Sequence, residues 1–210
     1  DLGEYEPRIY FGESSPLYSI VGGPGDDREL DYPASGSGTG EIRNTYAGEG
    51  GVPMGSPLRR LAYALKYREV NILLSDSVNA DSVFLDHREP RDRVQRVAPW
   101  LRLDGNPYPA VVDGRVQWIV DGYTVSDRYP YSQMEELGEV TIDSVQASAG
   151  NIGGIGQGEV NYIRNSVKAT VDAADGTVRL YSWDSEDPLL KAWSQAFDQS
   201  VEPMSEISSE

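Results

Sequence analysis

The sequence predicts an α+β fold built mainly from antiparallel strands. Two Asp-Gly pairs, at 113–114 and 175–176, lie between runs of apolar and polar residues that alternate, and this pattern is a strong signal for a β-hairpin. Three other segments begin at a proline and continue with apolar residues at helical spacing. A chain of 210 residues has the size of one domain. We therefore expect two hairpins, about three helices and a single soluble module over residues 1–210.

The first 90 residues contain short strand signals, one glycine-rich loop and the first helix. Aromatic and β-branched runs predict strands at 8–13, 17–21 and 82–85. Dense glycine predicts a variable loop over 22–55, with one short strand near 41–46. A helix is expected from Ser56-Pro57, with the pattern continuing toward Leu74. Its apolar stripe has the spacing of a helix face turned toward a core, and comprises Leu58, Leu61, Ala62 and Leu65.

The rest of the chain contains both hairpins and the other two helices. Pro90 and Asp187-Pro188 begin the helices. In the first hairpin, Val116, Trp118 and Val120 are expected on one face of the returning strand. A long strand follows at 160–173, with a buried face formed by Ile163, Val167, Ala169 and Val171. The polar and glycine-rich residues 133–158 predict a flexible loop before that strand.

Charge and composition exclude several classes of function. The formal net charge is −16 and the chain has no cysteine. An acidic surface repels phosphate groups, so neither nucleic acid nor a membrane surface is an expected partner. Without cysteine there is no disulfide framework, thiolate metal site or cysteine nucleophile. We also expect no cofactor, because neither glycine-rich stretch has the lysine of a phosphate-binding loop.

Several blocks of sequence resemble one known family. They are RIYFGESSPLYSIVG, SPLRRLAYALKYREVNILLSD, APWLRLDGNPYPAVVDG with WIVDGYT and YPYS, and NYIRNSVKATVDAADGTVRLYSWD followed by DPLLKAW. In this order they resemble uncharacterised protein family 0182, the large multi-spanning membrane proteins of actinobacteria and relatives. The resemblance implies that this chain is part of a large extracytoplasmic region, while the membrane-spanning helices lie elsewhere in the protein. It implies no catalytic residue, cofactor or substrate.

The chain itself has no apolar run of the ~18 residues that a membrane span needs, and no signal peptide. It begins at Asp1. We therefore expect a fragment of a longer protein that lies at the cell membrane, on the extracytoplasmic side, and does not itself insert in the membrane.

Carboxylates offer two candidate sites. Asp26, Asp27, Glu29 and Asp31 cluster in a glycine-proline loop and could bind calcium, although their spacing is not that of an EF-hand loop, and a solvated acidic loop is the alternative. Asp104 and Asp121 lie near aromatic residues and could act as a pair in glycoside hydrolysis. Each of these two precedes a glycine, however, so turn formation also explains it. The single histidine, His87, lies among charged residues and is expected to be solvated.

Aromatic residues between 98 and 132 are the candidates for binding. Trp100, Tyr123, Tyr129 and Tyr131 could line a groove that stacks on sugars or on a partner's chain, or could belong to the core. The leading hypothesis is a non-enzymatic binding or assembly platform in the cell envelope, whose partner is an unidentified envelope component or another membrane protein. The alternative is a hydrolase or transferase that acts on an envelope polymer.

Overall fold

The computed structural model describes residues 4–22, 29–33, 41–137, 158–197 and 200–208. The chain divides into two compact units, one of residues 15–88 and one of residues 1–14 and 89–210. Each unit combines helices with strands that pair mainly antiparallel, so the predicted α+β class is confirmed. The single domain over residues 1–210 stays a prediction.

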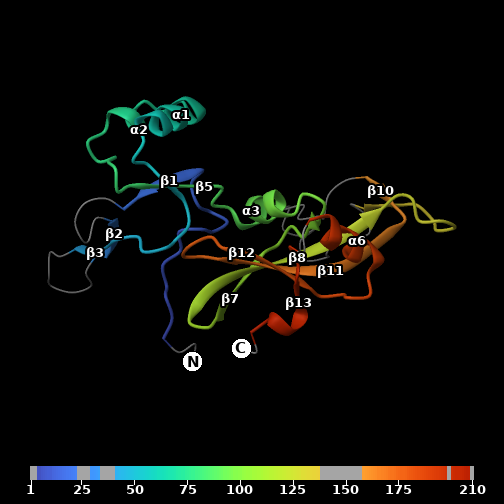
Figure 1. Cartoon of the computed structure of the whole chain (residues 1–210). Helices are drawn as coiled ribbons and strands as arrows, with labels where there is room; N and C mark the ends of the chain where they lie inside the picture. The colour runs from blue at the N-terminus through green and yellow to red at the C-terminus, as the bar shows by residue number, and fades with distance from the viewer. Residues whose placement is uncertain (1–3, 23–28, 34–40, 138–157, 198–199, 209–210) are drawn as a thin grey trace. The chain divides into compact units, whose positions relative to one another are not determined.

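The unit of residues 1–14 and 89–210 is built on a six-stranded sheet (Figure 1). Its order is β13-β12-β11-β8-β6, and β7 also pairs directly with β8, at residues 115–119, whereas β6 pairs with residues 122–123. All pairs are antiparallel except β12 with β13. The strands are β6 (Arg102–Leu103), β7 (Tyr108–Val112), β8 (Arg115–Ser126), β11 (Tyr162–Asp172), β12 (Val178–Ser182) and β13 (Glu202–Pro203). The short strands β9 (Glu135–Glu136) and β10 (Glu159–Val160) form a separate pair.

Both predicted hairpins are present. β7 and β8 meet at Asp113 and Gly114, whose φ angles of 50° and 72° are those of the two-residue turn that Asp-Gly favours. β11 and β12 meet at a turn that contains Gly176, with φ 75°. The N-terminal segment runs beside these turns, where the amides of Tyr10 and Phe11 donate to the carbonyl oxygen of Ala173.

Two helices cover one face of this sheet. They are α3 (Pro90–Val97) and α6 (Pro188–Ala196), and both begin at the predicted prolines. Glu89 caps α3 by accepting the amides of Arg91 and Asp92. Side chains of both helices are buried against alternate residues of the strands. This core comprises Val94, Ala98, Leu101, Leu103, Val120, Val167, Ala169, Val171, Leu180 and Leu190. The 3-10 helix η1 (Met204–Glu206) follows β13.

Two local predictions for this sheet are wrong. Asp121-Gly122 is not a turn but lies in the middle of β8, where a Cβ on Gly122 would be only 3.0 Å from Leu101 and 3.3 Å from Val167. Glycine is therefore needed there for close packing. The predicted alternation of β11 also breaks at a β-bulge between Asn165 and Val167. Because the bulge changes the face on which residues lie, Ile163 is exposed and Ser166 is buried.

The buried Ser166 belongs to a polar cluster that fixes α6 to the sheet. Asp187 has no exposed surface. Its carboxylate accepts hydrogen bonds from the hydroxyl groups of Thr124 (2.5 Å), Ser166 (2.5 Å) and Tyr162 (2.6 Å). It also caps α6 by accepting the amide of Leu189 at 2.9 Å. Burial acts to raise the pKa of Asp187, but these hydrogen bonds outweigh it and hold the pKa below its ordinary value.

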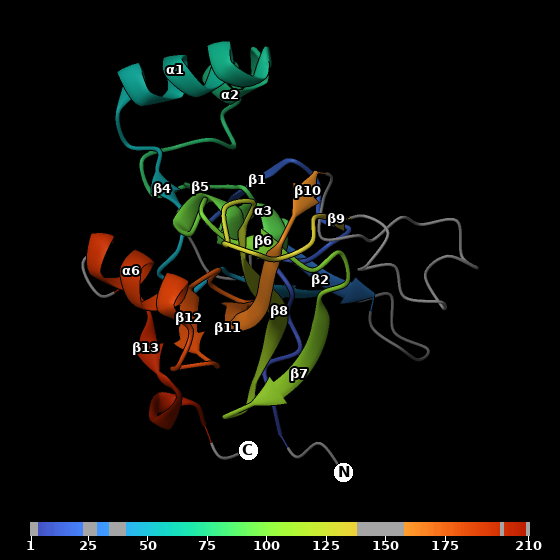
Figure 2. The ribbon, with the colours of Figure 1, turned by 90° about the vertical axis from the view of Figure 1, so that its right-hand side faces the viewer.

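In the described part of residues 15–88, the chain forms two small sheets and two helices. The sheet β1-β5-β4 is antiparallel and comprises β1 (Tyr18–Val21), β5 (Val83–Asp86) and β4 (Val52–Pro53). β2 (Glu29–Pro33) pairs with β3 (Glu41–Asn44), which confirms the short strand predicted near 41–46. The helices are α1 (Pro57–Tyr67) and α2 (Asn71–Leu74). They lie side by side, as both views show (Figures 1 and 2).

The inward face of α1 is not the predicted one. Ala64 is buried, and Tyr63 and Tyr67 pack with it around Phe84. Leu58, Leu61, Ala62 and Leu65 are all exposed. Residues 8–13, also predicted as a strand, lie outside the strands of the structure. In the predicted loops, residues 23–28, 34–40 and 138–157 lie outside the described residues. None of the described helices has both the length and the apolar character that a membrane crossing requires.

Candidate functional site

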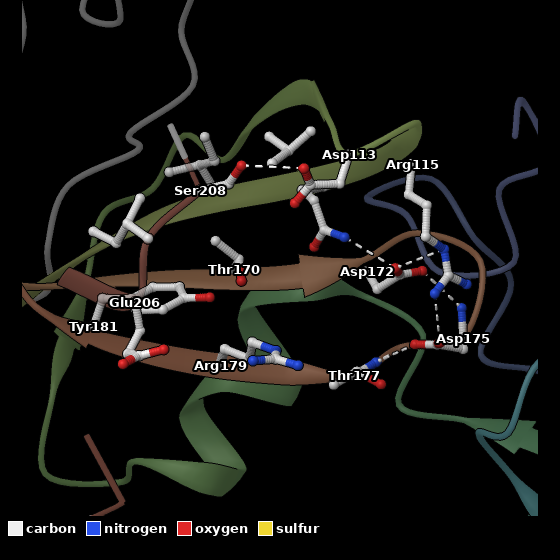
Figure 3. Close-up of a pocket in the computed structure, with 14 residues that line it drawn as sticks. Asp113, Arg115, Thr170, Asp172, Asp175, Thr177, Arg179, Tyr181, Glu206 and Ser208 are labelled. Atoms are coloured by element: carbon white, nitrogen blue, oxygen red, sulfur yellow. Dashed lines mark hydrogen bonds and ion pairs between the residues drawn. The ribbon is translucent and has the colours of Figure 1, made fainter. Parts of the chain in front are cut away.

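The face of the large sheet that lies opposite α3 and α6 carries a pocket of about 530 Å³ (Figure 3). Strand alternation explains why it forms there. Val120 of β8 and Val171 of β11 point into the core, so their neighbours Ile119 and Thr170 point to the other face. The pocket is lined from β7, β8, β11, β12 and the C-terminal segment, by Val112, Asp113, Arg115, Gln117, Ile119, Thr170, Asp172, Asp175, Thr177, Arg179, Tyr181, Glu206, Ile207 and Ser208.

The two hairpin turns and the C-terminal residues Glu206, Ile207 and Ser208 contribute to the lining of the pocket. Ser208 donates its hydroxyl to the carboxylate of Asp113 at 3.2 Å, which ties the C-terminal segment to the β7–β8 turn. Figure 3 shows these two residues on one side of the pocket and Arg179 on the other. The pocket therefore lies between the side chains of the strands and the C-terminal residues 206–208, which are bound at the edge of the sheet.

A hydrogen-bonded network holds the pocket wall. The buried carboxylate of Asp172 accepts the side-chain amide of Gln117 at 2.9 Å and lies 3.1 Å from Nε of Arg115. Its other oxygen accepts the backbone amides of Ala174 and Asp175. Arg115 also forms an ion pair with Asp175 at 3.1 Å. A charged group with this many partners is fixed in place, so the wall is preorganised.

Asp175 shows the electrostatic effect of this network. Burial acts to raise the pKa of Asp175, yet hydrogen bonds from Thr177 and the charge of the Arg115 guanidinium lower the pKa below its ordinary value. The side chain accepts the amide of Thr177 at 2.9 Å. Asp175 is therefore a charged part of the turn at neutral pH.

The lining supports the binding of a polar molecule that is not strongly anionic. Four acidic side chains (Asp113, Asp172, Asp175 and Glu206) and two basic ones (Arg115 and Arg179) give it a formal charge of −2. The charge of Arg115 is compensated by its two carboxylates, whereas Arg179 is more than half exposed and lies 3.6 Å from Glu202. Thr170, Thr177 and Tyr181 add hydroxyl groups. Such a mixture of donors and acceptors beside apolar surface suits recognition of a polar chain.

The two candidate catalytic aspartates lie near each other beyond this pocket. The amide of Asp104 donates to the carbonyl oxygen of Asp121, and burial raises the pKa of Tyr123, with a further contribution from both carboxylates. Asp104 accepts the amide of Asn106 in a local turn, and Asp121 forms an ion pair with Lys168. These contacts give each carboxylate a structural partner, and a catalytic role for the pair stays a prediction.

The four candidate aromatic residues lie in different surroundings. Trp100 stacks on Trp193 of α6, with ring centroids 5.8 Å apart, whereas Tyr123 packs against Leu137 and Val160. Tyr129 lies 5.3 Å from the ring of Tyr162. Tyr131 is fully exposed and has a positive φ of 61°, which is uncommon for a residue with a side chain. A binding role for these residues stays a prediction, with Tyr129 and Tyr131 as the exposed members.

The calcium prediction is not tested by the structure. Asp26 and Asp27 lie outside the described residues, and Glu29 and Asp31 are on β2. Within the described ranges, no three histidine or carboxylate side chains gather closely enough to hold a metal ion. Nε2 of His87 lies 3.6 Å from the carboxylate of Asp86, which also receives Lys66 at 2.8 Å.

Sequence reasoning missed the pocket. Its lining comes from residues 112–119, 170–181 and 206–208, and no local pattern connects these segments. The one usable signal was the alternation of β8, which places Gln117 and Ile119 on the face opposite Trp118 and Val120.

Comparison with known proteins identifies the family of this chain. Residues 1–210 match the family model described as Uncharacterised protein family (UPF0182). A UPF0182 protein of Arthrobacter sp. (strain FB24) is 57% identical over 206 residues, which cover 97% of this chain and 20% of that protein. The UPF0182 protein SCO5204 of Streptomyces coelicolor is 51% identical over 211 residues, covering 100% of this chain and 21% of that protein.

The chain thus spans about a fifth of the length of these relatives. No solved structure matches it. Because the family match covers every residue and the relatives share half or more of their aligned residues with it, this chain belongs to the family UPF0182.

Proposed function

We propose that this chain is a binding platform on the extracytoplasmic side of a cell membrane, and that it holds another envelope component on the uncovered face of its large sheet. The observation that supports this most is the pocket of about 530 Å³ on that face. A sheet that is covered by helices on one face and open on the other offers a rigid surface to a partner.

The network around Asp172 supports the same role. Arg115, Gln117 and Asp175 are already held by hydrogen bonds and ion pairs. A surface with fixed side chains loses little conformational entropy when it binds, and this favours binding. The formal charge of −2 on the lining makes a neutral or cationic polar segment a better partner than a phosphate-rich one.

The absence of cysteine from this chain allows a direct test in cells. Thr170→Cys, inside the pocket, and Glu186→Cys, whose side chain is 83% exposed away from the pocket, are introduced into a full-length protein that has no other cysteine. Intact cells are then treated with a membrane-impermeant maleimide. Glu186→Cys is expected to be labelled. Thr170→Cys is expected to stay unlabelled in cells, because the partner covers it, and to be labelled once the protein is purified.

The two variants separate the parts of the proposal. If Glu186→Cys reacts only after the cells are lysed, the chain faces the cytoplasm and the proposed location is wrong. If Glu186→Cys and Thr170→Cys react equally well in intact cells, the pocket is empty there and the proposed binding face is wrong.

A further inference from the structure

The surface of α1 and α2 exposes an unusual amount of apolar side chain. Six large apolar residues within 17 positions are exposed, and they are Leu58, Leu61, Leu65, Val70, Leu73 and Leu74. Three of them, Leu58 (75%), Leu65 (70%) and Leu74 (71%), have most of their surface in contact with solvent. An apolar surface of this kind on a helix pair marks an interaction site.

The inward side of the same helices is already filled. Tyr63 and Tyr67 lie against Phe84, with ring centroids 4.2 Å and 5.2 Å from it, and Ala64 and Ile72 are buried beside them. The spacing Leu58, Leu61 and Leu65 places the leucines together on the opposite side of α1. The outer leucine face is therefore not part of the core of this unit.

Basic charge is concentrated on the same segment. Residues 57–74 contain four basic residues (Arg59, Arg60, Lys66 and Arg68) and one acidic residue (Glu69), so their formal charge is 4 − 1 = +3. The whole chain has a charge of −16, so the remaining residues have −16 − 3 = −19. The helix segment is thus positive in a strongly negative chain.

The hydrogen bonds of Arg59 and Arg60 go to neutral acceptors. Arg59 donates to the carbonyl oxygen of Pro53, and Arg60 donates to those of Met54 and Val78. A carbonyl oxygen is neutral and does not cancel a guanidinium charge. By helical spacing, Arg59 and Lys66 lie seven residues apart at the border between the leucine face and the inward face. Lys66 is paired with Asp86, and Arg60 lies on the inward side, where Met54 and Val78 accept its hydrogen bonds. Arg59 and the exposed Arg68 therefore carry the argument.

We propose that the α1–α2 face (Leu58, Leu61, Leu65, Val70, Leu73 and Leu74) docks on the surface of a lipid bilayer that contains anionic headgroups. Leucines on one side and arginines at its border are the pattern of a helix that lies in the membrane interface. The 11 residues of α1 extend over about 16 Å, which is too short to cross the ~30 Å hydrocarbon core. The helix would lie along the surface, with the leucines in the acyl boundary and the arginines near the phosphates.

This proposal differs from what the net charge of the chain suggests. The overall charge of −16 argues against a membrane surface as a partner, but it is an average over all residues. A local patch of opposite sign acts within about 8 Å at physiological ionic strength. The proposal concerns the unit of residues 15–88 and does not depend on the pocket in the other unit.

Sedimentation with lipid vesicles tests the proposal on the 210-residue chain. We expect it to bind vesicles that contain phosphatidylglycerol and to bind pure phosphatidylcholine vesicles at least about tenfold more weakly. The double variant Leu58→Ser/Leu65→Ser is expected to lose at least about tenfold in affinity. Because both side chains are exposed, this variant should keep the circular dichroism spectrum of the parent. The matched control is Leu17→Ser, which is 71% exposed in the same unit but off the helices, and it should bind like the parent.

Three results would overturn the proposal. The first is no binding to either kind of vesicle. The second is equal binding by the parent and the Leu58→Ser/Leu65→Ser variant. The third is a dimer in analytical ultracentrifugation without lipid that this variant converts to monomers, since the face would then bind a second copy.

A full-length protein reconstituted into a bilayer gives a separate check. A fluorophore on Leu65→Cys is expected to be quenched by lipids that carry a nitroxide near the headgroup. A fluorophore that these lipids do not quench would mean that other parts of the protein cover the face, and the proposal would be wrong.

Discussion

Replacing Asp187 by alanine is expected to lower the free energy of unfolding by about 3 to 5 kcal/mol. The substitution removes the carboxylate that accepts hydrogen bonds from both Thr124 and Ser166. The side chains of Thr124 and Ser166 have no exposed surface, so their hydroxyl groups lose this acceptor inside the protein. An unsatisfied buried polar group costs about 1 to 3 kcal/mol. Loss of the N-cap of α6 adds about 1 kcal/mol. Urea denaturation followed by circular dichroism measures the change.

Two other variants test the reason for this effect. Glu186→Ala changes the neighbouring exposed side chain and should alter the free energy of unfolding by less than about 0.5 kcal/mol. Asp187→Asn keeps the shape but removes the charge. Since the pKa of Asp187 is lower in the folded state, its stabilisation is present above the unfolded pKa of about 3.9 and is lost as pH falls through the folded pKa. The penalty of Asp187→Asn should therefore shrink in acid. If Asp187→Ala cost no more than Glu186→Ala, the polar cluster would not be what holds α6.

Replacing Phe84 by alanine is expected to cost about 3 to 5 kcal/mol in the unit of residues 15–88. The ring has no exposed surface and contacts three tyrosine rings, those of Tyr18, Tyr63 and Tyr67, at centroid distances from 4.2 to 5.2 Å. Its removal leaves a cavity that these rings cannot easily fill. Hydrogen exchange with mass spectrometry should show faster exchange in peptides from β1, β5 and α1.

The control for this variant is Leu17→Ala, at an exposed position of the same unit, which should leave exchange unchanged. Because every member of the Phe84 cluster lies within residues 15–88, peptides from β8 and β11 should keep their protection in Phe84→Ala. Equal loss of protection in both sets of peptides would show that the two units unfold together, contrary to this expectation.

The parts of the fold that could be predicted depend on short local signals. Asp113-Gly114 needs two positive φ angles, and few residue pairs other than Asp-Gly supply them easily. Pro57, Pro90 and Pro188 each begin a helix, because proline has no amide hydrogen to lose in the first turn. These signals act within a few residues and hold whatever the rest of the chain does.

Which face of α1 turns toward the core could not be predicted, because both faces carry side chains with large apolar parts. Leucine spacing indicated one amphipathic face, but tyrosine also has a large apolar ring, and Tyr63 and Tyr67 took the inward positions. Phe84 decides which face of α1 is turned inward, because Tyr63 and Tyr67 pack against it. The residue spacing along α1 does not reveal where Phe84 lies in the folded chain. The resulting exposed leucines are the basis of the proposed membrane contact.

The bulge in β11 and the close packing of Gly122 were hidden for a similar reason. The sequence pattern places Ser166 among the polar residues of a solvent-exposed face. It is buried, however, because Asp187, 21 positions later, accepts the hydrogen bond of its hydroxyl group. Gly122 reads as part of a turn, yet it is needed because Leu101 and Val167 lie against it. The environment of each residue is determined by a neighbour that is close only in the folded chain.

The most direct test of the proposed binding face is site-specific photo-crosslinking in cells. A benzophenone amino acid replaces Arg179, an exposed residue at the pocket, or Glu186, outside it, in a full-length protein. If the uncovered face of the sheet holds an envelope component, light should give an adduct from position 179 and none from position 186. No adduct from position 179, or the same adduct from both positions, would contradict the proposal.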